Sequence, residues 1–124
     1  MRVGNKEHHV KLAKEKMYAA MEEFQKGRYT VVGDLAIKAI EQAMEAAASI
    51  EGMHFHIEPR IAYANRVRWI KDRFPSTSKD IDMLWGAYGS LGYEGVDGER
   101  AEKVLEAMER ILDELERKTG LRFR

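Results

Sequence analysis

The feature that most constrains the fold is a pair of helix-forming segments joined by the tight turn Gly27-Arg28-Tyr29. In the first segment, from about Lys6 to Lys26, apolar side chains recur every three or four positions, which is the spacing of one helix face. The second segment, from about Tyr29 to Glu51, carries two such stripes, so it is expected to be a central helix that touches neighbours on two sides. A helical hairpin over Ala13 to Ala48 is therefore the centre of the expected fold.

Small side chains are concentrated in the second segment of this hairpin. They allow a partner helix to approach closely, because the distance between packed helices depends on the side chains at the contact. Such a surface suits either the core of a bundle or an interface between subunits. The residues concerned are Ala36, Ala39, Ala43, Ala46, Ala47 and Ala48.

Three further helices are expected after the hairpin. The third begins with Pro59 in its first turn and extends to about Phe74. The fourth carries an apolar stripe from Ile81, and glycine at every third position from Gly86 to Gly98 predicts that its end frays into a loop. The last helix ends at Gly120. The core candidates of the third helix are Tyr63, Val67, Ile70 and Phe74.

No segment alternates with period two for long enough to predict a sheet. The expected architecture is thus an all-α antiparallel bundle of about five helices, four of them long, forming a single domain over residues 1–124. A chain of this length buries a sufficient core without disulfides or metal.

Charge and cysteine content narrow the functional classes. Lysine plus arginine number 21 and aspartate plus glutamate also 21, so no global positive field draws in nucleic acid, and any such site must come from local charge. The absence of cysteine fits a reducing compartment. No apolar run approaches the roughly 18 residues of a membrane span, and the start of the chain has no apolar signal core. A cytoplasmic protein without membrane contact is expected.

The third helix has the largest local excess of positive charge. Arg66 and Arg73 are seven residues apart and share a helix face, so they would hold phosphates together. The alternative is a solvated bundle face paired with acidic neighbours. Arg100, in the first turn of the last helix, favours an anionic ligand, and Tyr93 is an aromatic in the predicted loop. The candidate residues for binding nucleotide or RNA are Arg60, Arg66, Arg73, Tyr93 and Arg100.

The sequence predicts no metal site and no cofactor. His54 and His56 form one pair and His8 and His9 another, but neither spacing puts two imidazoles on one helix face, so ordinary loop or terminal histidines are expected. No catalytic residue is predicted either. There is no cysteine and no Gly-x-Ser-x-Gly elbow, and no serine has a histidine near it in sequence.

The hairpin resembles the HEPN family, the helical domains named for their occurrence in higher eukaryotes and prokaryotes. The resemblance rests on the segment from Ala13 to Phe24, the glycine-aromatic turn at Gly27, and the alanine-rich stretch from Ala36 to Ala46 with Glu41 as its central glutamate. It extends more loosely to the segment from Gly92 to Gly98 and the Ala/Glu-rich helix after it.

The resemblance implies particular partners, but this sequence departs from the motif that the family's ribonucleases use. Ribonucleases of the family carry an arginine with a histidine about five positions later, and that histidine exchanges protons near neutral pH. None of the arginines at positions 60, 66, 68 and 100 has a histidine at that spacing. The family therefore implies a non-catalytic homodimeric module that binds nucleotide, RNA or a partner protein, such as the nucleotidyltransferase of a toxin-antitoxin pair. The alternatives are a divergent ribonuclease that uses Arg100 or Arg60, and a purely structural or regulatory subunit.

Overall fold

The computed structural model describes residues 6–93 and 98–124, apart from the side chains of residues 87–93. These residues form helices joined by turns and short loops, which confirms the all-α prediction. The elements are α1 (Lys6–Gln25), α2 (Tyr29–Ser49), the 3-10 helix η1 (Phe55–Ile57), α3 (Pro59–Arg73), the 3-10 helix η2 (Pro75–Thr77), α4 (Ser78–Tyr93) and α5 (Gly98–Thr119).

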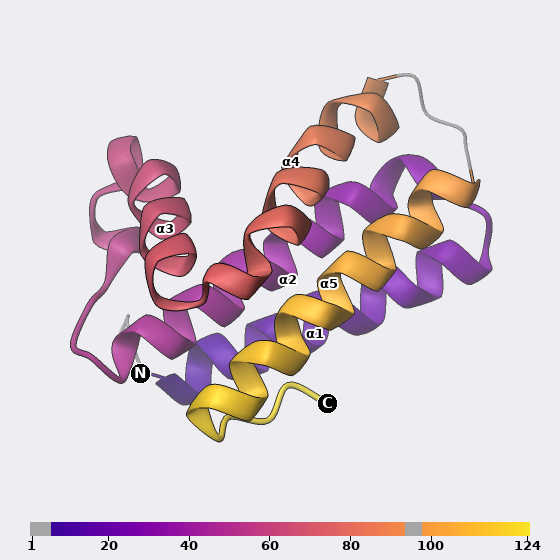
Figure 1. The fold of residues 1–124 in the computed structure, drawn as a ribbon. Helices are drawn as coiled ribbons and strands as arrows, with labels where there is room; N and C mark the ends of the chain where they lie inside the picture. Colours follow the sequence, from indigo (N-terminus) through magenta and orange to yellow (C-terminus); the bar gives the residue numbers. More distant parts are fainter. Residues whose placement is uncertain (1–5, 94–97) are drawn as a thin grey trace.

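Helix α2 is the central element of the bundle. It packs against α1 in the predicted hairpin and also contacts α5, α4 and α3. Helix α5 lies along α1 and α2, and α4 packs on α2 and α5. Helix α3 stands to one side, where most of its contacts are with η1 and η2 (Figure 1). The prediction that the second helix touches neighbours on more than one side is confirmed.

The turn between α1 and α2 is set by Gly27, whose φ of +74° lies in the left-handed region that glycine favours. Its N–H donates to the carbonyl of Phe24 at 3.0 Å, which closes the end of α1. The ring of Tyr29 then packs against Phe24 and covers the start of α5. A Cβ added at Gly98 would lie 3.0 Å from that ring, so a glycine at this position lets Tyr29 approach closely.

The small residues of α2 form the core of the bundle. All six alanines named above are buried within the single chain. Of the two uses expected for this surface, it therefore forms the core of the bundle and not an interface between subunits. Opposite these alanines, α5 buries an apolar stripe along one face. The fully buried members of that stripe are Ala101, Val104, Met108, Ile111, Leu112 and Leu115.

The prediction of core residues in α3 is wrong for Tyr63. Its side chain is 51% exposed and leans on Trp85 at the surface, with the two ring centroids 5.9 Å apart. Ile70 and Phe74 are buried as predicted, and Trp69 is buried with them. Because α3 stands beside the bundle, only part of its surface reaches the core, through Ala62 near its start and Trp69 and Ile70 near its end.

The predicted loop after Gly86 is also wrong, since α4 continues through Tyr93. Glycine lowers helix propensity by up to about 1 kcal/mol per residue without forbidding the conformation. The glycines of α4 therefore lower its stability without ending it at Gly86. The rest of the predicted loop, residues 94–97, lies outside the described part of the chain.

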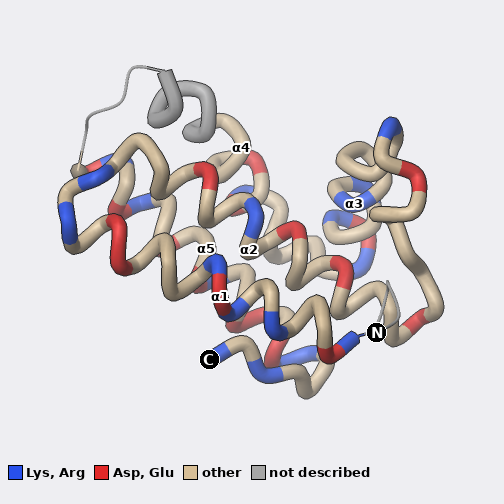
Figure 2. The backbone as a smooth tube through the Cα atoms, turned by 180° about the vertical axis from the view of Figure 1, so that it is seen from behind, with Lys and Arg blue, Asp and Glu red and all other residues tan. Residues whose placement is uncertain are grey.

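Charges of both signs alternate along the helices (Figure 2). Some join residues four positions apart on one helix, such as Lys103 with Glu99 at 3.5 Å. Others link different helices, such as Arg110 of α5 with Asp80 of α4 at 2.8 Å. Among the described helices, none is both long and apolar enough to cross a membrane.

Candidate functional site

A buried carboxylate, that of Glu45, lies at the end of the bundle where α2 meets η1 and α3. Its residue is 1% exposed and sits among the buried alanines of α2. One oxygen, Oε1, accepts hydrogen bonds from the ring Nδ1 of His56 at 2.7 Å and from the backbone N–H of His56 at 3.3 Å. The other oxygen, Oε2, accepts from Nε of Arg66 at 2.7 Å. The carboxylate therefore joins α2 to both elements that follow it.

The electrostatics of this network favour an ionised Glu45. Burial by itself raises the pKa of the carboxyl, but the hydrogen bonds from His56 and Arg66 outweigh it and leave the pKa below its ordinary value. Arg66, whose side chain is 13% exposed, also lies 3.6 Å from Glu41. The guanidinium is thus held between two carboxylates of α2.

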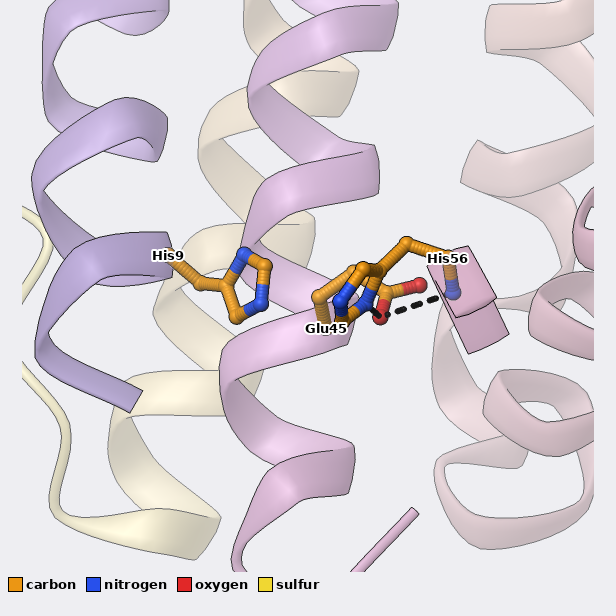
Figure 3. A group of neighbouring side chains, drawn as sticks. All are labelled: His9, Glu45 and His56. Atoms are coloured by element: carbon orange, nitrogen blue, oxygen red, sulfur yellow. Dashed lines mark hydrogen bonds and ion pairs between the residues drawn. The ribbon is translucent and has the colours of Figure 1, made fainter. Parts of the chain in front are cut away.

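A second buried polar residue, His9 on α1, faces this network across α2. The residue is 3% exposed, and its Nδ1 lies 2.7 Å from Oε1 of Gln42. Because an amide oxygen only accepts, Nδ1 of His9 carries the proton in this bond. Figure 3 shows the His9 ring pointing toward Glu45 and His56. The centroids of the two imidazole rings are 4.9 Å apart, in an edge-to-face arrangement.

Both rings have one nitrogen engaged and one open. Nε2 of His9 and Nε2 of His56 are buried without a hydrogen-bond partner among the described residues. Burial is the main reason that the pKa of His9 lies below its ordinary value, and the bond to Gln42 offsets it only in part. A neutral imidazole with a proton on Nδ1 has a lone pair on Nε2, which is the form that binds metal ions or accepts a proton.

The sequence predicted ordinary loop or terminal histidines, but the His9 ring is buried on α1 and the His56 ring is hydrogen-bonded to Glu45. The sequence argument considered each pair along one helix, whereas the fold brings the two pairs together from opposite sides of α2. One signal was present in the sequence. Glu45 lies within a run of alanines predicted to be buried, and a buried charge requires a partner.

A pocket opens beside this network, between η1 and α3. It has a volume of about 570 Å³ and combines an aromatic wall with charged side chains. Trp69 and Phe55 form that wall, with ring centroids 6.1 Å apart. The indole N–H of Trp69 is buried and lacks a partner in the described part of the chain. The other residues that line the pocket are Met53, Asn65, Arg68, Asp72 and Arg73.

The residues predicted to bind nucleotide or RNA lie in different places. Arg66 is turned inward onto Glu45, whereas Arg73 lines the pocket and pairs with Glu51 at 2.9 Å. Arg60 is exposed at the start of α3, and Arg100 is exposed in the first turn of α5. Tyr93 is the last residue of α4, and its side chain is outside the described set. Their binding roles stay predictions.

Sequence reasoning did not select Trp69, Arg68 or Asn65 as a group. Their spacing puts Asn65, Arg68 and Trp69 along one side of a helix, at intervals of three and four residues. Trp69 is also a core residue, since it is only 6% exposed. Comparison with protein-family models, with curated proteins and with solved structures gives no significant match.

Proposed function

We propose that this chain is a non-catalytic, HEPN-like helical module of the cytoplasm that binds a nucleotide or RNA. The observation that carries the proposal is the pocket between η1 and α3, where aromatic rings and arginines lie together. It includes Arg73, one of the residues selected from the sequence. The resemblance of the α1–α2 hairpin to the family supports the same class of function.

The lining of the pocket suits a base attached to a phosphate. Trp69 and Phe55, which are 6% and 8% exposed, offer a small aromatic surface that a base would contact. Arg68 and Arg73 supply positive charge for phosphate, and Asn65 supplies an amide for the edge of a base. The pair between Arg73 and Glu51 is half-exposed, so it is weak and exchanges readily for a phosphate.

Charge reversal at the pocket tests this proposal. We expect the double variant Arg68→Glu/Arg73→Glu to bind a short labelled single-stranded RNA, or ADP, at least about tenfold more weakly than the unmodified protein at low salt. Fluorescence of Trp69 gives an independent readout, because a stacked base quenches indole emission. The chain has only one other tryptophan, Trp85, which does not line this pocket.

The matched control is Arg117→Glu/Lys118→Glu at the end of α5. These residues are exposed and pair with Glu114, so the control makes the same change in net charge away from the pocket. Its affinity should fall only slightly. Equal losses in the two double variants would show that general electrostatic attraction accounts for binding. Absence of binding by the unmodified protein would overturn the proposal.

We further propose that the module is a homodimer, or docks a partner protein, through the surface around η1 and α3. Large apolar side chains are exposed in this part of the chain, and exposed apolar patches commonly mark protein interfaces. A nucleotidyltransferase of a toxin-antitoxin pair is the partner that the family resemblance implies. The exposed residues are Ile50, Met53, Ile57, Ile61 and Tyr63.

Oligomeric state is the measurement for this part of the proposal. Light scattering of the unmodified protein at micromolar concentration is expected to give the mass of a dimer, and Ile57→Asp/Ile61→Asp is expected to give a monomer, because it places two charges in an apolar interface. Tyr18→Asp on α1 is the control, since Tyr18 is 53% exposed on another element. If the unmodified protein has the mass of a monomer, the proposal of a homodimer is wrong.

A further inference from the structure

The four histidines of the chain lie together at one end of the bundle. Ring centroids are 5.6 Å apart for His8 and His9, 4.9 Å for His9 and His56, and 6.1 Å for His54 and His56. The rings come from the first turn of α1 and from the segment around η1, which are 45 or more residues apart in sequence. Imidazole is the commonest protein ligand of transition metals.

Within this group, His9, His56 and Glu45 offer one ligand atom each, and these atoms all lie within 4.8 Å of one another. Ligand atoms around a tetrahedral zinc are about 3.3 Å apart, because zinc–nitrogen bonds are about 2.0–2.1 Å long. The three side chains would therefore draw together by about 1–1.5 Å, which a small movement of rings and carboxylate achieves.

We propose that His9, His56 and Glu45 form a binding site for one divalent transition-metal ion of the zinc class. Two imidazoles and a carboxylate are a ligand set that zinc uses, with a fourth position left for water. The site joins three elements, α1, α2 and η1, so a bound ion would cross-link them.

The hydrogen bonds around the rings support this assignment. Gln42 holds Nδ1 of His9, the arrangement that fixes the tautomer of metal-binding histidines. The open Nε2 atom of His9 is then a buried lone pair that no described residue uses. Nδ1 of His56 lies 2.7 Å from Oε1 of Glu45, and a metal ion bound by these two atoms would replace the proton between them. Burial keeps His9 neutral, as a metal ligand must be.

The charges of Glu45 and Arg66 act in opposite directions on the binding of a divalent ion. Glu45 supplies the negative charge that a divalent ion requires, while Arg66 opposes the ion from the Oε2 side of the carboxylate. The guanidinium is also 3.6 Å from Glu41, which remains to neutralise it when Glu45 turns toward a metal. The nitrogen ligands favour zinc, cobalt, nickel or copper over magnesium and calcium, which prefer oxygen ligands.

The test uses the full chain, freed of metal with a chelator and titrated with Zn²⁺ or Co²⁺. We expect one ion per chain by calorimetry and an increase in melting temperature with zinc concentration. Cobalt should give visible absorption bands with the intensity of a four- or five-coordinate site, and Mg²⁺ should neither bind nor stabilise. On zinc addition, the imidazole NMR signals of His9 and His56 should shift more than that of His8.

Single substitutions then identify the ligands. Loss of a residue that only orients a ligand costs about 10–100-fold in metal affinity, so His9→Gln and His56→Gln should each cost at least about 100-fold. The matched control is His8→Gln, which changes the adjacent residue on α1 outside the three-residue group and should leave affinity unchanged. Circular dichroism confirms that each variant is helical.

Two results would overturn the site. The first is a failure of the unmodified protein to bind Zn²⁺, a result that does not depend on the folding of any variant. The second is an equal loss of affinity in His8→Gln and His9→Gln, which would assign binding to adjacent histidines near the chain start. Neither result bears on the pocket between η1 and α3, because the pocket is lined by other residues.

Discussion

Replacing Glu45 by alanine is expected to lower the free energy of unfolding by about 3–5 kcal/mol, the cost of removing one partner from a buried ion pair. The substitution leaves the guanidinium of Arg66, which is 13% exposed, without its closest carboxylate. It also leaves both the ring and the backbone N–H of His56 without their acceptor. Urea denaturation followed by circular dichroism measures the change.

Glu41→Ala is the matched control for this prediction. Glu41 lies one turn before Glu45 on the same helix. Its carboxylate is 3.6 Å from the same guanidinium, and its side chain is 17% exposed. Its loss should cost less than that of Glu45, because Arg66 keeps its shorter, hydrogen-bonded contact with the Glu45 carboxylate. The double variant Glu45→Ala/Arg66→Ala should lose less than the sum of the two single changes, because the two side chains interact. Equal losses for Glu41→Ala and Glu45→Ala would contradict the central role of Glu45.

The same network should also appear in the pH dependence of stability. The pKa of Glu45 is lower in the folded protein than in the unfolded chain, so the unfolded state binds the proton more readily. The stability that Glu45 contributes is therefore present above about pH 4.3, the ordinary glutamate pKa, and is lost as the pH falls through the lowered native value. Glu45→Ala should remove this part of the acid dependence.

The fold was predictable because its main elements are amphipathic on their own. The stripe of α5 and the alanine surface of α2 give helical periodicity that packing then uses, and Gly27 and Gly120 end their helices as expected. Two local signals failed. The glycines of α4 predict a loop after Gly86, but the backbone stays helical through Tyr93. Tyr63 lies on the expected stripe of α3, but its side chain is 51% exposed because only part of the surface of α3 reaches the core.

The candidate site was less predictable, because it depends on contacts between segments far apart in sequence. His9 and His56 are 47 positions apart, and no local pattern indicates that their rings meet. Arg66 was selected from the sequence, together with Arg73, as a candidate phosphate ligand. The fold directs that charge onto Glu45, which the sequence argument did not select. The sequence signal for this contact was the position of Glu45 within a run of alanines expected to be buried, because a buried carboxylate requires a positively charged or hydrogen-bonding partner.

Shortening the side chain of Phe123 should also lower the stability of the fold strongly, although Phe123 lies outside every described helix. After Gly120, whose φ is +80°, the chain folds back along the bundle and buries Phe123 completely (Figure 1). The backbone N–H of Phe123 donates to Oε2 of Glu116 at 2.7 Å, which fixes the segment on α5. Phe123→Ala is expected to lower the free energy of unfolding by about 3–5 kcal/mol, through lost burial and the cavity left behind.

The neighbouring residue provides the control, because Arg122 is exposed in the same segment. Arg122→Ala should change stability by no more than about 0.5 kcal/mol, whereas Phe123→Leu should fall between the two alanine variants, since leucine fills most of the cavity. Urea midpoints of the three variants give this order directly. A Phe123→Ala midpoint equal to that of Arg122→Ala would mean that the C-terminal segment does not pack on the bundle in solution. The predicted order instead makes this segment part of the core, a contribution that helical periodicity alone does not reveal.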